Sequence, residues 1–148
     1  MVAVVERVLG ARVTVDGLVV GEIGKGLLVL LGVAQDDEIS DLDYIVRKTV
    51  NLRIFPDNGK MSLSVKDIGA SVLVVSQFTL LGDARKGNRP DFGGAANAAH
   101  AKRLYEACIE AFRAEGINTA TGEFGADMKV ESIGDGPVTI LLDSKRRF

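Results

Sequence analysis

Polar residues interrupt an apolar, strand-like run in the segment SVLVVSQFTL, at positions 71–80. Ser76, Gln77 and Thr79 surround Phe78, so this strand end combines backbone amides with hydroxyl and carboxamide side chains. Donors gathered at one point stabilise the oxyanion that develops on a carbonyl oxygen during ester hydrolysis or acyl transfer. A strand that runs out into solvent has the same pattern, so these residues alone leave both interpretations open.

Side chains that could catalyse a reaction by themselves are scarce. His100 is the only histidine and no GxSxG nucleophile elbow is present, so its place in a predicted helix favours a surface residue over a catalytic base. Cys108, the only cysteine, lies on the apolar face of that helix, as a small core residue does. One His and one Cys cannot form a nitrogen and sulfur metal site. We therefore expect no metal and no cofactor, although an all-oxygen site stays open.

Two glycine-containing segments have both a structural and a functional interpretation. In GEIGKG, at 21–26, Val19 stands where a phosphate-binding loop requires its first glycine, and Lys25 is followed by glycine in place of Ser or Thr. A hairpin connection is the better interpretation. Gly136-Pro137 forms either a simple turn or a cis peptide bond, and the low frequency of cis bonds before proline favours the turn.

The composition is that of one globular domain over residues 1–148. With 47% hydrophobic residues and a net charge of −2, the chain has no overall attraction to nucleic acid or anionic membranes, and we expect neither a DNA nor a membrane partner. The basic segments RKGNR (85–89) and KRRF (145–148) have the charge to meet phosphates, but charge alone favours a solvated loop and tail. The single cysteine and the lack of a secretory signal favour a cytoplasmic location.

Apolar periodicity predicts many strands and two helices. The strand candidates are residues 2–8, 12–23, 26–33, 51–55, 71–80, 127–133 and 137–143. Asp16-Gly17 marks a hairpin turn. One helix begins after an N-cap at Ser40, with Asp41 facing solvent, and the other runs from about Ala95 to Glu115. This order favours a mixed α/β domain in which sheet packs on sheet and helices cover one outer face, and it disfavours a dinucleotide-binding fold.

Three motifs, in order along the chain, carry a resemblance to a known family. SQFTL at 76–80, FGADMKV at 124–130 and DGPVT at 135–139 resemble the hallmarks of the D-aminoacyl-tRNA deacylases, and the likeness extends over essentially the whole chain. It implies a three-layer β/β/α fold with a barrel-like core of mixed sheets and two main helices on one face. It also implies a homodimer with active sites at its interface, which binds the 3′ end of aminoacyl-tRNA. Gly134 departs from the family, which usually has Asn there.

The activity that this resemblance implies is hydrolysis of the ester of D-aminoacyl-tRNA, and of mischarged glycyl-tRNA, to free amino acid and tRNA. In the family the bond of Gly136-Pro137 is cis, and this pair inserts into the partner's active site, where it excludes an L side chain. Specificity then comes from rejection rather than from an attractive pocket. An inactive RNA-binding or assembly module of the same fold is the alternative.

The resemblance also assigns roles within the first motif. Ser76, Gln77, Phe78 and Thr79 form the catalytic segment, with the Phe78 amide as the main oxyanion donor. The nucleophile is then a water molecule assisted by the ribose hydroxyl of the substrate. Thr79 as nucleophile is the less favoured alternative, because no base is evident near it in the sequence.

Three further residues receive supporting roles from the resemblance. Arg7 would donate hydrogen bonds to carbonyl oxygens near Gly136-Pro137 and so hold that turn in place. The alternative is an ordinary arginine on the surface of a strand. Phe124 and Met128 would bind adenosine, because an aromatic ring and a polarizable thioether suit a base. Both are nearly as well explained as core residues.

Overall fold

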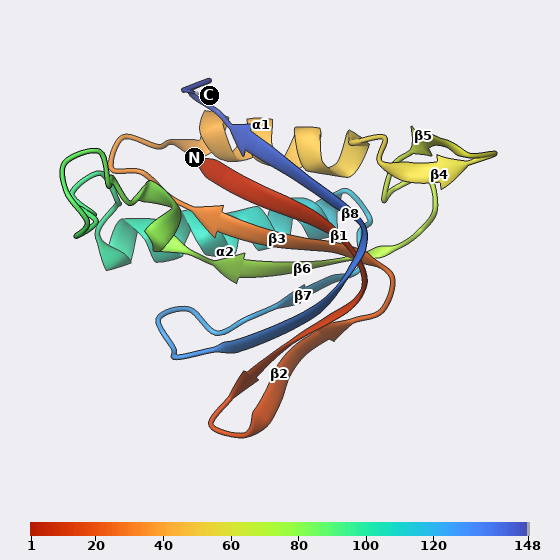
Figure 1. The fold of residues 1–148 in the computed structure, drawn as a ribbon, viewed down its shortest axis with the longest axis horizontal. Coiled ribbons are helices and arrows are strands. Elements are labelled where there is room, and N and C mark those ends of the chain that lie inside the picture. Colours follow the sequence, from red (N-terminus) through yellow and green to blue (C-terminus); the bar gives the residue numbers. More distant parts are fainter. Residues whose placement is uncertain (148) are drawn as a thin grey trace.

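Strand β1 (Val2–Val15) lies at the centre of the fold in the computed structural model, which describes residues 1–147 (Figure 1). Along one edge, β1 pairs first with β3 (Gly26–Gly32) and then with β2 (Leu18–Ile23). Along its other edge it pairs with β8 (Lys129–Asp143) over almost its whole length. Parallel pairing extends the sheet from β3 to β6 (Ser71–Ser76) and β7 (Thr119–Thr121). Within residues 1–147, no further strand pairs with the outer edge of β8.

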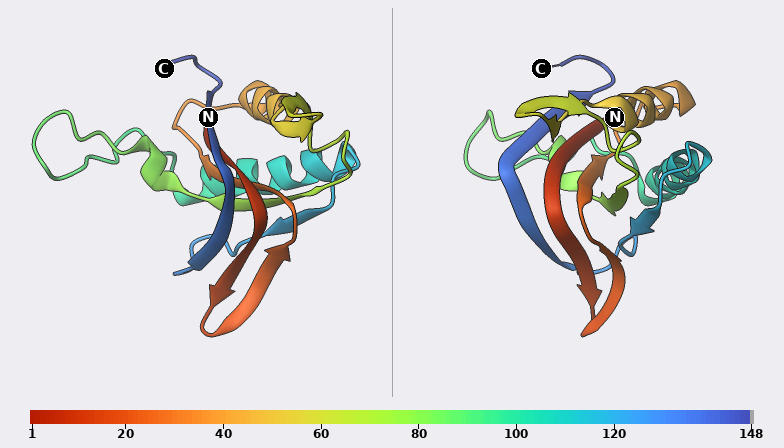
Figure 2. Two further views of the ribbon diagram at one scale, coloured as in Figure 1. Left: turned by 45° about the vertical axis from the view of Figure 1, so that its right-hand side comes forward. Right: turned by 90° about the vertical axis from the view of Figure 1, so that its right-hand side faces the viewer.

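The sheet curls until its ends approach each other. Gly21 of β2 lies so close to β7 that an added Cβ would be 2.0 Å from the carbonyl oxygen of Thr121. Both helices, α1 (Ile39–Asn51) and α2 (Ala98–Ala114), cover one face of the sheet, and the hairpin of β4 (Phe55–Asp57) and β5 (Lys60–Leu63) follows α1 (Figure 2). The expected mixed α/β fold with a barrel-like core and two helices on one face is confirmed.

Two apolar clusters hold these layers together. The larger one fills the space between the helices and the sheet, where Leu104 and Phe112 of α2 are fully buried. The smaller one lies inside the curled sheet and consists of Val8, Ala11, Val13, Ile23, Leu28, Leu73 and Val75. Successive side chains of a strand point to opposite faces, so Leu27 and Val29 of β3 join the first cluster and Leu28 the second. One sheet therefore serves both cores.

Strands that the sequence divides are continuous in the structure. Residues 127–133 and 137–143, predicted as separate strands, lie almost entirely in β8, and residues 2–8 and 12–15 both lie in β1. The pairing of β1 with β8 continues through the glycine-rich segment between the predicted strands with two shifts of register. A long antiparallel partner supplies hydrogen bonds to a segment that would otherwise form a turn. The turn at Asp16-Gly17 is confirmed, with φ angles of 49° and 78°.

The first helix begins earlier than predicted. Its N-cap is Glu38 and not Ser40, and the Glu38 amide donates to Asp41 Oδ2 at 2.8 Å. The prediction that Asp41 faces solvent is therefore wrong, because this capping bond requires its carboxylate to turn inward, where it is buried. Burial opposes ionisation of Asp41, but hydrogen bonds from Glu38 and Ser144 lower its pKa. The second helix begins after Asn97, whose Oδ1 accepts from the His100 amide at 2.9 Å.

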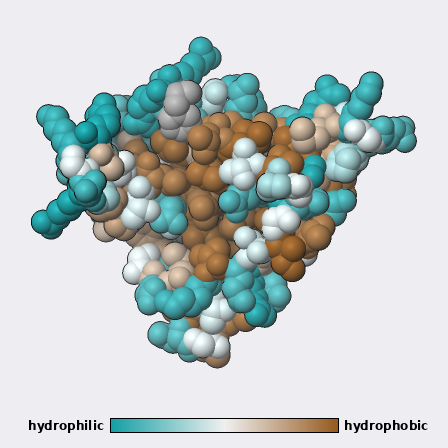
Figure 3. Space-filling view, in the orientation of Figure 1, coloured by the Kyte–Doolittle hydropathy of each residue, from teal (hydrophilic) through white to brown (hydrophobic). Residues whose placement is uncertain are grey.

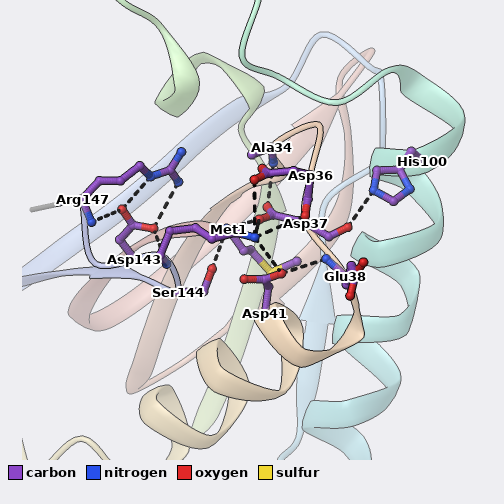
Figure 4. A network of polar contacts seen from close by, with 11 residues as sticks. Met1, Ala34, Asp36, Asp37, Glu38, Asp41, His100, Asp143, Ser144 and Arg147 are labelled. Atoms are coloured by element: carbon purple, nitrogen blue, oxygen red, sulfur yellow. Dashed lines mark hydrogen bonds and ion pairs between the residues drawn. The ribbon is translucent and has the colours of Figure 1, made fainter.

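A network of charged groups joins both ends of the chain to the start of α1 (Figure 4). The ammonium of Met1 is fully buried; it donates to Asp37 Oδ1 at 2.5 Å and to Ser144 Oγ at 2.8 Å. Lys145 Nζ lies 3.4 Å from Asp41 Oδ2. Because β1 begins and β8 ends here, these contacts hold the paired ends of the two strands against the helical layer.

Candidate active site

Strand β6 ends at Ser76, where the chain turns sharply. The Gln77 amide donates to the carbonyl oxygen of Leu31 at 2.8 Å and completes the pairing with β3. Residues Phe78–Leu81 then form a short 3₁₀ helix, η1. The prediction of a strand over 71–80 therefore holds only as far as Ser76. The tight turn takes Phe78 and Thr79 out of the buried layer to the surface.

Free backbone donors stand at the start of η1. Within residues 1–147, no acceptor receives a hydrogen bond from the amide of Phe78 or Thr79, as expected for the first residues of a helical turn. The Gln77 amide already donates to a carbonyl oxygen of β3 and is not free for a ligand. The Gln77 side chain supports the turn instead, because its Nε2 donates to Thr79 Oγ1. The donors that remain for a ligand are the two amides after Gln77.

A cavity of about 500 Å³ opens beside these residues. Its lining comes from the residue after β3, the end of β6 and the start of η1, the region at the start of α2, and the segment that leads into β8: Val33, Val75, Ser76, Gln77, Phe78, Ala96, Ala98, Ala101, Phe124, Gly125, Ala126, Asp127, Met128 and Val130. Ser76, Gln77 and Phe78 thus share one cavity with Phe124 and Met128, although more than forty positions of sequence separate the two groups. Thr79 does not line this cavity.

Two aromatic residues that the sequence analysis missed support the cavity wall. Tyr105 of α2 packs against Phe124 with ring centroids 5.7 Å apart, and its hydroxyl donates to the Val74 carbonyl oxygen at 2.9 Å. Burial raises the pKa of Tyr105 to about 12, so the hydroxyl stays a donor at neutral pH. Phe92 packs edge-on against Phe78 at 5.3 Å. Helical spacing places Tyr105 on the buried face of α2, whereas no local pattern marks Phe92.

Gly136 and Pro137 lie exposed in β8, and the bond between them is cis. The preference for a simple turn, which came from the frequency of cis bonds, is therefore wrong. Arg7 lies behind this segment with only 8% of its surface exposed. Its Nε donates to the carbonyl oxygen of Asp135 at 3.1 Å, and its Nη1 donates to that of Ile54 at 2.6 Å. A buried guanidinium thus joins the residue before Gly136 to the segment between α1 and β4.

Gly136 and Pro137 do not reach the cavity of their own chain. Ser76 pairs with Leu31, and the ladder continues through β1 to Leu142 of β8, so β6 and β8 are three strands apart. Three strand spacings amount to roughly 14 Å. Pro137 also lies farther along β8 than Leu142 by roughly 16 Å of extended chain. Neither residue lines the cavity.

The side chains that might have catalysed by themselves lie elsewhere. His100 Nε2 is 2.9 Å from the Asp37 carbonyl oxygen, and its Nδ1 is 3.2 Å from a nitrogen of Arg103, outside the cavity lining. Cys108 is fully buried, and burial raises its pKa to about 12, so the prediction of a core residue is confirmed. In the described part of the chain, no cluster of three His, Cys, Asp or Glu residues is suited to a metal ion. Over residues 1–147, no helix has the length and apolar character needed to cross a bilayer.

Comparison with known proteins decides the family. The family described as D-Tyr-tRNA(Tyr) deacylase matches residues 4–143. The chain belongs to this deacylase family. Relatives named D-aminoacyl-tRNA deacylase from Clostridioides difficile (strain 630) and Anaeromyxobacter dehalogenans (strain 2CP-C) are 56% and 58% identical over 149 residues, with both chains covered completely. The resemblance drawn from the motifs is confirmed, and with it the expectation of an enzyme of the deacylase class.

Solved structures support the fold of this deacylase family. A structure of the c-Myc DNA Unwinding Element Binding Protein has a TM-score of 0.91 and 44% identity, and the match covers 97% of this chain and 98% of that one. A probable eukaryotic D-amino acid tRNA deacylase has a TM-score of 0.83, with 96% and 98% coverage. The identity to the second is 18%, so it bears on the fold alone.

Proposed function

We propose that the protein hydrolyses the ester between a D-amino acid and the 3′ end of tRNA, and that it treats mischarged glycyl-tRNA in the same way. The observation that carries this proposal is the cavity that combines Phe78 with Phe124 and Met128. A free amide donor and a surface suited to a nucleobase lie in one cavity, as an ester at the end of an RNA requires. Membership in the deacylase family supports the same reaction.

The backbone at the start of η1 is the proposed catalyst. The free amide of Phe78, with that of Thr79 next to it, donates to the carbonyl oxygen of the ester as it becomes an oxyanion. A water oxygen bonds to the carbonyl carbon, the ester bond to the ribose breaks, and the ribose oxygen leaves with a proton as a hydroxyl group. Removal of one such donor costs roughly 2.7–4 kcal/mol in other enzymes. No side-chain nucleophile is required.

The wall opposite these amides is the proposed adenosine site. Phe124 and Met128 line the cavity and are partly exposed within it. Tyr105 packs against the Phe124 ring, which stays partly exposed. Aromatic rings stack on unpaired bases in RNA recognition, and the Met128 thioether adapts to an aromatic neighbour.

A homodimer is proposed because β8 presents an apolar surface and an unpaired edge. Val130, Ile133 and Leu141 of β8 are between 40% and 64% exposed, and Leu9 of the paired strand β1 is 53% exposed. Figure 3 shows a broad apolar area on the face where β8 lies in Figure 1. An exposed apolar strand edge of this length invites pairing with another chain, and a contiguous apolar surface favours a protein partner. A second copy supplies a partner surface of the same kind.

Gly136 and Pro137 of the second copy are the proposed chiral filter. They are exposed and do not line the cavity of their own chain. Main-chain carbonyls at this segment would accept hydrogen bonds from the substrate ammonium and so fix the α-carbon. The side chain of an L-amino acid would then clash with the backbone of this segment, whereas the side chain of a D-amino acid would point to solvent. Glycine has no side chain that could clash. Rejection of this kind tolerates many D-amino acids.

Gly134 does not argue against this function. A Cβ added there would have no atom within 4 Å, and its φ is not in the left-handed region. The backbone at Gly134 therefore also suits the Asn that the family usually has. An inactive RNA-binding or assembly module remains the alternative, and the free amides of Phe78 and Thr79 favour the enzyme over it.

The deciding experiment measures amino acid release from D-Tyr-tRNA and L-Tyr-tRNA by the purified protein, with Gly-tRNA as a third substrate. We expect cleavage of the D ester and the glycine ester and survival of the L ester. No D-ester cleavage at micromolar enzyme would refute the enzyme proposal in favour of the binding module. Equal cleavage of D and L esters would refute the filter. The cytoplasmic location that the sequence favours stays a prediction, which fractionation of cells would test.

A further inference from the structure

A loop of residues 84–90, here called the basic loop, projects beside the cavity. Asp83 and Asp91 close its base by two backbone hydrogen bonds, from the Asp83 amide to Asp91 at 2.7 Å and from the Asp91 amide to Asp83 at 2.9 Å. Between them the chain extends away from the sheet and helices (Figure 2). Because the base is paired, the loop has a defined direction although its tip has no core contacts.

The base of the loop is connected directly to the proposed catalytic segment. Phe92, one residue after the closing pair, packs on Phe78 with ring centroids 5.3 Å apart. The chain continues along the cavity, where Ala96 and Ala98 form part of the lining. The base of the basic loop therefore adjoins Phe78, which lines the cavity and has a free amide.

Two cations of the loop have no acidic partner in the described part of the chain. Arg85 is neutralised by Asp83, with Nη2 and Oδ2 2.5 Å apart, and its hydrogen bonds lower the pKa of Asp83 to about 2. Lys86 and Arg89 are exposed, and no carboxylate within residues 1–147 lies within ion-pair distance of either. The protein as a whole carries a net charge of −2. The loop is therefore a local positive feature on a slightly acidic molecule.

We infer that Lys86 and Arg89 bind backbone phosphates of the tRNA acceptor stem. This inference rests on the proposed function: with the 3′ adenosine bound in the cavity, the nucleotides that precede it would leave the cavity past Phe78, next to which the loop begins. Lysine and arginine contacts to phosphates supply affinity without sequence information. The site would then hold tRNA at two points, the terminal base in the cavity and the sugar-phosphate backbone at the loop. That division suits an enzyme that accepts many tRNAs.

The test compares the double variant Lys86→Ala/Arg89→Ala with a matched control, Lys48→Ala/Lys60→Ala. The control removes the same charge from exposed positions in α1 and β5, at the other end of the molecule (Figure 1). Binding of fluorescently labelled, uncharged tRNA is measured by anisotropy between about 50 and 200 mM salt. We expect the loop variant to bind about tenfold more weakly at the lower salt. The slope of log affinity against log salt concentration should also be smaller in magnitude by about 2, because each lost phosphate contact removes roughly 0.9 from the slope.

Kinetics separate this inference from the proposed function. With D-Tyr-tRNA the loop variant should raise KM about tenfold and leave kcat unchanged, because the amides and the adenosine site are intact. If the wild type and the loop variant bound tRNA with equal affinity and equal salt dependence, the inference would be overturned. Hydrolysis of the D ester by the wild type would still support the proposed function in that case. A similar loss in the control would overturn it too, since the effect would then reflect net charge. A wild type that binds tRNA with the expected salt dependence but cleaves no D ester would contradict the proposed function alone.

Discussion

Phe92 packs the edge of its ring against Phe78, with ring centroids 5.3 Å apart and the planes at 71°. Phe78 is 54% exposed, so this contact is a main restraint on the side chain next to the proposed oxyanion donor. A Cβ added to Gly82 would lie 2.9 Å from the Phe92 ring, which shows how tightly this segment is packed. The geometry of the proposed catalytic turn thus depends on a residue outside all three sequence motifs.

Replacement of Phe92 should affect activity more than stability. In Phe92→Ala we expect kcat for D-Tyr-tRNA to fall about tenfold, because small displacements of a positioned group are costly in catalysis. The free energy of unfolding should fall by only about 1 kcal/mol, as for loss of one aromatic pair at the surface. Phe92→Tyr, which keeps the ring, serves as control. A large loss of stability with normal kcat would contradict a positioning role.

Thr79→Ala should retain substantial activity. The hydroxyl accepts a hydrogen bond from Gln77 at an exposed site, and its loss should cost about 1 kcal/mol or less, within about tenfold in kcat/KM. The backbone amides remain in the variant. Single-turnover kinetics of Thr79→Ala and Thr79→Ser distinguish the mechanisms, because a nucleophilic Thr79 requires that Ser preserve the reaction and Ala abolish it.

Arg7→Lys should weaken the discrimination between D and L esters. Arg7 donates through two separate nitrogens to the carbonyls of Asp135 and Ile54, and a lysine ammonium cannot reproduce that planar fork. We expect the ratio of kcat/KM for D-Tyr-tRNA over L-Tyr-tRNA to fall by about tenfold, a cost of about 1.4 kcal/mol to the discrimination. Arg12→Lys, at an exposed ion pair with Glu131, is the matched control. An unchanged ratio in Arg7→Lys would exclude Arg7 as a support of the filter.

Ile133→Asp should separate the subunits of the proposed dimer. Ile133 is 64% exposed on β8, and a charge there would be buried in a dimer without a partner. We expect monomers in analytical ultracentrifugation and a loss of D-ester selectivity, because the cavity would lack the partner's Gly136-Pro137. Met61→Asp, at a residue 58% exposed in β5, controls for the added charge. A wild type that sediments as a monomer would contradict the dimer directly.

Stability should fall in acid through Asp143. Burial opposes ionisation of this carboxylate, but hydrogen bonds from the Arg147 side chain and from the amides of Lys145 and Arg147 outweigh it and lower its pKa from 3.8 to about 2. The unfolded chain therefore binds the proton more readily, so the stabilisation is complete above about pH 4 and is lost as the pH falls towards 2. Urea unfolding of the wild type and of Asp143→Asn at pH 6 and pH 2.5 checks this. The difference, roughly 1–3 kcal/mol at pH 6, should shrink at pH 2.5.

Much of the secondary structure followed from local pattern. The apolar faces of both helices, the turn at Asp16-Gly17 and the buried strand before Ser76 are confirmed, because hydrophobic period and turn chemistry act over a few neighbouring residues. The predicted ends of the helices and strands are less accurate. Residue type favours Ser40 as N-cap, but the carboxylate of Asp41 accepts a hydrogen bond from the Glu38 amide and the helix begins earlier.

The sequence by itself determined the family, the apolar faces and the residue types of the site, because motifs and periodicity are properties of the chain. Tertiary structure decided what those residues do together. Long-range pairing with β1 made β8 continuous through Gly136-Pro137, and the strand order placed this pair three strands from Ser76. Tertiary contacts placed Phe124 in the cavity that Phe78 lines and placed Phe92 against the Phe78 ring. Such contacts depend on register and layer packing between distant segments, which no local pattern encodes.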